Sequence, residues 1–143
     1  MPLRNLISLL KPHRTVPKVP WTAAHRWDLS PKRVAILVFG LAIFGLGDGM
    51  IIQSGLGNAP WSVLAQGISL KSGLSIGTST LIIGALVLSL WIPLKERPGF
   101  GTLANILIIS LFIEVGTKIF PLQEGILTGL IFTFLGITLV GIG

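Results

Sequence analysis

Two acidic residues are the first candidates for chemistry in this 143-residue chain, because each lies within a long apolar run. Asp48 lies in the run 34–53, and Glu114 lies in the run 102–121. Placing a carboxylate at the centre of a bilayer costs about 2.5–3.5 kcal/mol, so such residues usually face protein, water or a bound ion. Asp48 and Glu114 are therefore the candidate intramembrane proton or cation site.

The two carboxylates are expected at similar depth in the membrane. At a rise of about 1.5 Å per residue, Asp48 lies about 7 Å, and Glu114 about 4 Å, outward of the centre of its run. If the two helices pack together, the carboxylates could share one proton or one cation. Structural roles are the alternative. Glu114 could pair with Lys118 one turn later, and Asp48 could form a hydrogen bond to the following turn, at Gln53, Ser54 or Asn58.

A glycine-rich turn after the first apolar run is the second candidate. Glycine lets backbone amides approach a ligand closely, and the positive end of a helix that begins there attracts anions. Asn58 is suited to cap such a helix, and Pro60 is suited to its first turn. The alternative is a plain turn with Trp61 at the membrane interface. The candidate path-lining residues are Gly55, Gly57, Asn58, Pro60 and Trp61.

Catalytic chemistry has little support in the sequence. Cysteine is absent, and both histidines, His13 and His25, precede the first apolar run. The hydroxyl side chains in and between the apolar runs, such as Ser62, have no base near them in the sequence. No phosphate-binding loop motif is present either. We therefore predict no enzyme activity, no metal site and no cofactor.

The elements that must position these residues are membrane spans. Hydrophobic residues make up 51% of the chain and charged residues only 11%, whereas soluble domains carry about 25% charged residues. A helix of about 20 residues crosses the roughly 30 Å hydrocarbon layer. The segment 59–70 is too polar to cross and predicts a short interfacial or re-entrant helix. The predicted spans are 34–53, 74–94, 102–121 and 125–143.

The sequence thus predicts an all-α, polytopic transmembrane helix bundle with about four spans and one short helix. This transmembrane domain, 33–143, follows a basic tail, 1–32, and seven of the eleven Lys and Arg residues precede residue 34. Such a tail could bind nucleic acid. We favour a cytoplasmic tail instead, because Lys and Arg accumulate on the cytoplasmic side of membranes. The lipid bilayer is therefore the expected partner, and nucleic acid is not.

Three motifs in the middle of the chain carry a resemblance. They are GLG at 55–57 with PW at 60–61 and Gly67, GLSIGT at 73–78, and PGFGT at 98–102 with Asn105. Their order and spacing make the stretch 55–115 similar to the YczE-type bacterial integral membrane proteins, a group related to YyaS and YitT. The resemblance implies a membrane location and a repeat-built fold, but no known reaction. Members of the family are longer, so we expect this chain to correspond to their N-terminal part.

These observations favour an uncharacterised bacterial membrane protein that acts as a secondary transporter or exporter of a small solute. Asp48 and Glu114 would be its proton or cation sites, and the glycine-rich turn would line the path. The rival hypothesis is an accessory membrane protein that assists a partner and transports nothing. Another membrane protein or a second copy of the chain is the further candidate partner. We expect a multi-pass protein of the bacterial inner (plasma) membrane with a cytoplasmic N-terminus.

Overall fold

A computed structural model describes residues 25–143 of the chain. Residues 1–24, and with them most of the predicted basic tail, lie outside the described residues. All regular secondary structure within 25–143 is helical, so the predicted all-α class is confirmed. The helices are α2 (Pro31–Gln53), α3 (Pro60–Ser72), α4 (Ile76–Ser89), α5 (Phe100–Ile119) and α6 (Ile126–Ile142).

Within residues 25–143, α2 and α5 are the two helices that are long and apolar enough to cross a membrane by themselves. They contain 23 and 20 residues, which correspond to about 35 Å and 30 Å of helix. Proline begins α2 at Pro31, where its missing N–H is not needed for the helix. Gly99 precedes α5 in an extended conformation. The predicted spans 34–53 and 102–121 correspond to these two helices.

Helices α3 and α4 form a bent pair, with an angle of 115° between them. Gly73 ends α3 in the left-handed region, at φ 72°, which glycine adopts without a Cβ penalty. Ser75 then begins α4, because its side chain accepts a hydrogen bond from the Thr78 N–H at 3.2 Å. Helix α4 has only 14 residues, so it is shorter than the predicted span 74–94.

The described residues thus contain two candidate membrane spans, or three if the bent pair α3–α4 is one broken span. Helix α6 is apolar but has 17 residues, fewer than the two longer candidates. The prediction of about four spans is therefore not confirmed by helix length alone. The predicted short helix 59–70 corresponds to α3, which has 13 residues.

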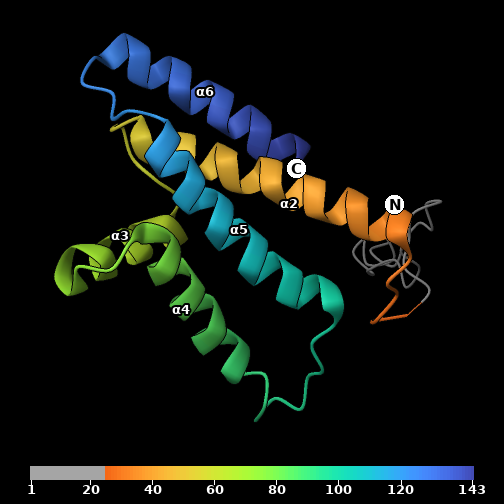
Figure 1. Cartoon of the computed structure of the whole chain (residues 1–143). Helices are drawn as coiled ribbons and strands as arrows, with labels where there is room; N and C mark the ends of the chain where they lie inside the picture. Colours follow the sequence, from red (N-terminus) through yellow and green to blue (C-terminus); the bar gives the residue numbers. More distant parts are fainter. Residues whose placement is uncertain (1–24) are drawn as a thin grey trace, which may run out of the picture.

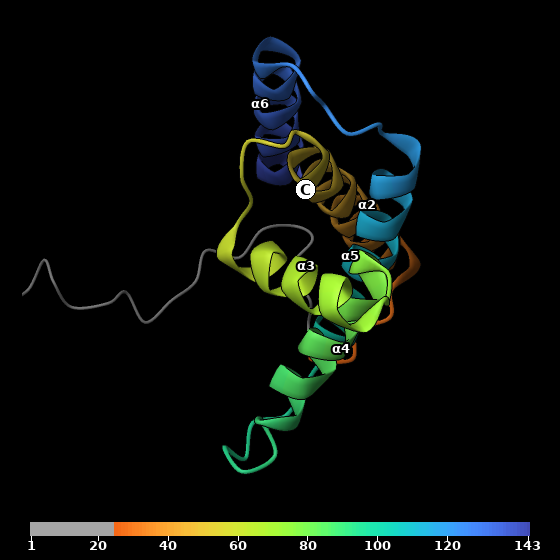
Figure 2. The same cartoon turned by 90° about the vertical axis from the view of Figure 1, so that its left-hand side faces the viewer.

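The long helices lie in a row in which each packs on its neighbour. Helix α2 packs against α6 on one side and α5 on the other, and α4 packs against α5 (Figure 1). Helix α3 runs across the end of α4 (Figure 2). Gly45 and Gly49 of α2 face Ile109 and Gly116 of α5, respectively. The later residue of α2 thus meets the later residue of α5, so the two helices are parallel.

The other pairs of the row are antiparallel. Gly47 of α2 faces Gly136 of α6, while the end of α2 is next to the start of α6, since Gly129 lies against Ser54. In the α4–α5 pair, Gly77 lies against Glu114, and the later residue Gly84 lies against the earlier one, Ile106. Small residues thus bring these helices together, as is common between membrane helices.

Large apolar side chains cover the outer faces of the row. Phe39 of α2 and Phe134 of α6 are each 69% exposed, and Leu107 of α5 is 59% exposed. Water-soluble monomers rarely expose continuous apolar surface of this kind, whereas lipid tails solvate it. The outer faces therefore agree with a membrane location.

Candidate functional site

Asp48 is buried where α2 meets α3. Its side chain accepts a hydrogen bond at Oδ2 from the Ser62 hydroxyl, at 2.8 Å. Asp48 is 8% exposed and Ser62 is 3% exposed. The turn before α3 brings Ser62 to this place: Gly55 and Gly57 have φ values of 71° and 137°, which side chains other than glycine rarely adopt. The chain can therefore fold back sharply from α2 into α3.

A cavity of about 370 Å³ opens beside the Asp48 carboxylate. Apolar residues of α2, α5 and α6 form much of its wall, among them Phe44, Ile109 and Val140. Of the described residues that form this wall, Asp48 is the one that is charged. The polar side chains that line it are those of Asp48, Ser62, Thr80, Asn105 and the indole of Trp61. A mostly apolar wall with a few converging polar groups is the usual make-up of a small-molecule site.

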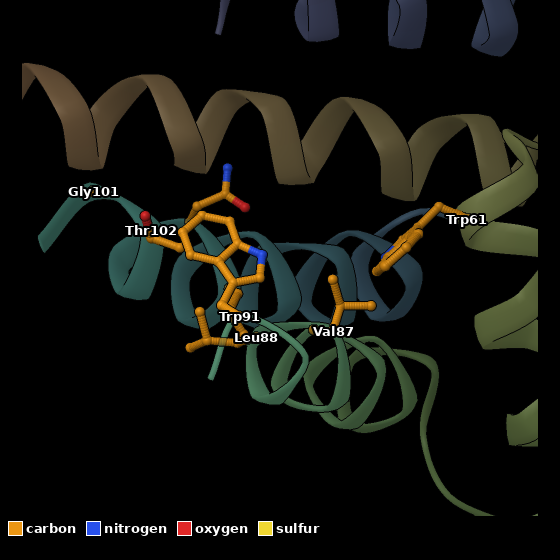
Figure 3. Close-up of a pocket in the computed structure, with 9 residues that line it drawn as sticks. Trp61, Val87, Leu88, Trp91, Gly101 and Thr102 are labelled. Atoms are coloured by element: carbon orange, nitrogen blue, oxygen red, sulfur yellow. The ribbon is translucent and has the colours of Figure 1, made fainter. Parts of the chain in front are cut away.

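A second cavity, of about 480 Å³, adjoins the first between α4 and α5. The two cavities share Trp61, Gly84, Asn105 and Ile106 in their walls. Figure 3 shows Trp61 from α3 at one end, Val87 and Leu88 from α4 along the wall, and Thr102 from α5 near Trp91. Together the cavities form a hollow that runs along α5 from Asp48 to the start of that helix.

Asn105 borders both cavities, as Trp61 does. Its side-chain amide makes no hydrogen bond with any of residues 25–143, although it borders both cavities. Thr80, by contrast, donates its hydroxyl to the Ile76 carbonyl at 2.9 Å. An amide with two donors and an accepting oxygen can bind a polar group of a ligand. Asn105 is therefore the second polar contact that the hollow offers, after Asp48.

Glu114 does not line either cavity, and both of its oxygens have partners. Oε1 lies 2.9 Å from the Lys118 ammonium. Oε2 accepts a hydrogen bond from the Gly77 N–H, at 3.0 Å, in the first turn of α4. A carboxylate near a helix N-terminus satisfies a free amide and interacts favourably with the helix dipole. The arrangement shows Glu114 joining α5 to the start of α4.

The structure therefore places the two acidic residues at similar heights but in different surroundings. Gly49 lies against Gly116, so Asp48 and Glu114 are nearly level along the parallel pair of helices. Asp48 is hydrogen-bonded to α3, whereas Glu114 is hydrogen-bonded to α4. Within residues 25–143 they have no hydrogen-bond partner in common. Of the two structural alternatives, the Glu114–Lys118 pair is present, and Asp48 bonds Ser62 instead of the turn after α2.

Of the candidate residues of the glycine-rich turn, only the last, Trp61, lines the hollow. Trp61 lines both cavities, and its neighbours Ala59 and Ser62 line the one beside Asp48. Gly55, Gly57, Asn58 and Pro60 are not among the lining residues of either cavity. Asn58 does not cap α3, because the N-cap position is Ala59 and the Asn58 side chain is hydrogen-bonded to Gln66. Pro60 occupies the first turn, as expected.

Three polar residues of the cavity beside Asp48 were not candidates in the sequence: Ser62, Thr80 and Asn105. Ser62 lies two residues after Pro60, the start of α3, so its contact with Asp48 depends on how the intervening turn folds. The sequence did contain a clue to Asn105, because this polar residue follows the PGFGT motif and lies in the first turns of an apolar run. A side chain of this kind in a span usually faces protein or water.

Comparisons with known proteins agree on one family. The family of unknown function DUF6198 matches residues 31–143. An uncharacterized protein of Haemophilus influenzae is 43% identical over 130 residues, which are 91% of this chain and 60% of the relative. The uncharacterized membrane protein YczE of Bacillus subtilis is 30% identical over 119 residues, 82% of this chain and 53% of the relative.

A third relative matches a shorter stretch of the chain. The uncharacterized protein YyaS of Bacillus subtilis is 41% identical over 49 residues, 34% of this chain and 24% of the relative. The resemblance to the YczE-type group is thereby confirmed. The chain spans 60% and 53% of the length of the two relatives that it matches most extensively. No solved structure matches the chain.

Proposed function

The chain belongs to the DUF6198 family of unknown function, and we propose that this membrane protein is a secondary transporter or exporter of a small solute. In this proposal Asp48 is the proton or cation site. The hollow that the two cavities form is the solute path, and Trp61 and Asn105 contact the solute. The absence of enzyme activity remains a prediction.

The proposal includes four membrane crossings. Helices α2 and α5 are parallel neighbours, so the chain must return across the membrane between them if both are spans. The bent pair α3–α4 supplies that return. Discontinuous helices of this kind occur at the binding sites of secondary transporters, where the irregular backbone lines a cavity. Helix α6 is antiparallel to α2 and would make the fourth crossing.

The proposal also fixes an orientation. The starts of the parallel helices α2 and α5 lie at one end of the bundle, together with five basic residues: Arg26, Lys32, Arg33, Lys95 and Arg97. The opposite end of the described chain has Lys71, Lys118 and Glu124. Lys and Arg accumulate in short cytoplasmic segments. We therefore place the N-terminal end of α2 in the cytoplasm and the protein in the bacterial inner membrane.

The observation that carries the transport proposal is the Asp48 carboxylate in the wall of a cavity inside the bundle. Ser62 is its hydrogen-bond partner at Oδ2, and none of residues 25–143 forms a salt bridge with it. A buried carboxylate that lacks a cationic partner favours a bound proton or cation over a bare charge. Glu114, with Lys118 and an amide as partners, has the smaller part in this proposal and serves to hold α4.

Transport can be tested in liposomes with the purified protein. A trapped pH-sensitive dye would report proton movement while a panel of Na⁺, K⁺, amines, carboxylates and amino acids is added outside. We expect Asp48→Asn to reduce solute-coupled proton flux to the level of empty liposomes, because the amide cannot release a proton. Glu124→Gln is the matched control, since Glu124 lies in the loop before α6, and it should leave the flux unchanged.

The size-exclusion profile of Asp48→Asn in detergent must match that of the parent protein, so that a loss of flux is not a loss of fold. Coupled flux that persists in Asp48→Asn would contradict the proposed site. If no solute of the panel moves protons in the parent protein, and none is taken up when a Na⁺ or K⁺ gradient is imposed, the accessory role becomes the better hypothesis.

A further inference from the structure

The basic end of the bundle contains a cleft that is separate from the proposed transport path. It has a volume of about 480 Å³ and lies between the segment before α2 and the loop between α4 and α5. Its wall is formed by Arg26, Trp27, Lys95, Glu96, Arg97 and Pro98. We propose that this cleft binds the phosphate-bearing headgroup of an anionic phospholipid.

Charge is the first argument for this ligand. Among residues 25–143, three cationic side chains line the cleft, those of Arg26, Lys95 and Arg97, against one carboxylate, that of Glu96. Lys95 and Arg97 form no salt bridge with any of the described residues, 25–143. The other nearby carboxylate, Asp28, is paired with Arg33. The cleft therefore has an excess of positive charge that an anion can neutralise.

The cleft is also held in shape by contacts between its two walls. The Phe100 N–H donates to the Arg26 carbonyl at 3.0 Å, and the Arg26 guanidinium donates to the Arg97 carbonyl at 3.3 Å. A Cβ at Gly99 would approach the Arg26 carbonyl oxygen to 2.8 Å, so glycine allows this close contact. The loop and the segment before α2 thus form one unit, and a ligand need not order them.

Lys95 has a backbone conformation that fits a functional position. Its φ is 56°, which makes it the one residue other than glycine with a positive φ in the part of the chain that the structure describes. Such a conformation is uncommon for residues other than glycine and occurs often at binding sites. The hydrogen bond from the Glu96 N–H to the Trp91 carbonyl, at 3.1 Å, closes the turn that holds it.

The location of the cleft favours a lipid as its ligand over a free anion. The cleft lies at the level where the apolar helices α2 and α5 begin, so acyl chains of a bound lipid could run along their exposed faces. Trp27, 50% exposed, lies in the wall of the cleft, and indole rings prefer the headgroup region of bilayers. Basic residues next to a span attract anionic lipids in this region. This inference does not depend on transport.

The test is lipid binding by native mass spectrometry of the detergent-solubilised full chain. The probes are palmitoyl-oleoyl phosphatidylglycerol, the zwitterionic phosphatidylcholine with the same acyl chains, and inorganic phosphate. We expect phosphatidylglycerol to bind at least tenfold more tightly than phosphatidylcholine. The double variant Lys95→Gln/Arg97→Gln should weaken phosphatidylglycerol binding roughly twentyfold or more, at roughly fivefold for each charge near the headgroup.

Two controls make the result specific. Lys71→Gln removes an exposed cation at the other end of the bundle and should change phosphatidylglycerol binding less than twofold. The double variant keeps the Arg97 carbonyl that Arg26 binds, so its thermal midpoint without added lipid should stay close to that of the parent. Equal binding of the two lipids, an unchanged double variant, or full displacement of phosphatidylglycerol by millimolar inorganic phosphate would each overturn the proposal.

Discussion

Glu114 has a structural role at the level of single residues, because its carboxylate completes the N-terminus of another helix. Ser75 accepts the Thr78 amide, and Glu114 accepts the Gly77 amide from across the α4–α5 contact. We predict that Glu114→Ala lowers the free energy of unfolding by about 0.5–2 kcal/mol, the usual effect of losing an N-cap. Thermal unfolding in detergent, followed by circular dichroism, measures the change.

Two milder substitutions separate the cap from the ion pair. Glu114→Gln keeps an oxygen that can accept the Gly77 amide, so it should cost less than Glu114→Ala. Lys118→Gln removes an ammonium whose side chain is 74% exposed, and exposed pairs contribute about 0–1 kcal/mol. If Lys118→Gln destabilises the protein as much as Glu114→Ala does, the ion pair and not the cap is the important contact.

The sequence predicted which residues are polar inside the membrane better than it predicted their partners. Asp48 and Glu114 stand out because any charge in an apolar run is costly. The partner of Glu114 on its own helix, Lys118, was predicted from the spacing and is present. The partners on other helices, Ser62 and Gly77, depend on which way each helix faces. In a helix that is apolar on all sides, the hydrophobic pattern does not indicate the buried face. The contact of Asp48 with α3 therefore required the three-dimensional arrangement.

At the level of elements, the contact between α4 and α5 depends on a missing side chain at Gly77. A Cβ there would lie 2.5 Å from the Glu114 Cβ and 2.6 Å from the Ser110 carbonyl oxygen. We predict that Gly77→Ala separates the two helices and lowers stability by about 1–3 kcal/mol, as overpacking does. The measurement is the thermal midpoint in detergent.

Gly67 provides the control for this substitution, since a Cβ at Gly67 would meet nothing within 4 Å. Both glycines lie within helices, α3 and α4. Gly67→Ala should therefore stabilise the protein by about 0.5–1 kcal/mol through helix propensity alone. A Gly77→Ala midpoint at or above that of Gly67→Ala contradicts the close packing described here.

The bent pair α3–α4 gives the second prediction for elements. The chain has no cysteine, so single cysteines can be labelled without background. Leu70 at the end of α3 is 87% exposed, and Leu94 after α4 is 68% exposed. If the pair crosses the membrane, Leu70→Cys and Leu94→Cys should react with a membrane-impermeant maleimide from opposite sides of sealed vesicles. Labelling of both from one side would exclude the crossing.

The sequence predicted the limits of the long helices well and the limits of the bent pair α3–α4 less well. The ends of α2 and α5 lie within three residues of the predicted spans. The predicted span 74–94 was too long. It included most of the turn at residues 90–95, because Trp91 and Leu94 continue the apolar pattern of α4. Hydropathy measures transfer to lipid and does not detect where a helix ends.

For the whole molecule, the uneven distribution of Lys and Arg predicts the orientation in the cell. We expect Leu122→Cys, in the loop after α5, to react with an impermeant maleimide on intact spheroplasts. Leu94→Cys should react only after the membrane is permeabilised, because it lies at the basic end. The side chains of Leu122 and Leu94 are 63% and 68% exposed, so both positions are accessible to reagent. The reverse pattern would place the basic end outside.

The contacts between neighbouring helices of the row are not all of the same kind. Helix α2 meets both neighbours through glycine backbone, at Gly49 with Gly116 and at Gly47 with Gly136, so little can give way there. Helix α4 is held to α5 near Gly77, where Glu114 accepts an amide, and again at Gly84, which lies against Ile106. Helix α3 is held to α2 by the hydrogen bond from Ser62 to Asp48. A movement of α3 and α4 that widens the passage would therefore have to change the contacts of Asp48 itself.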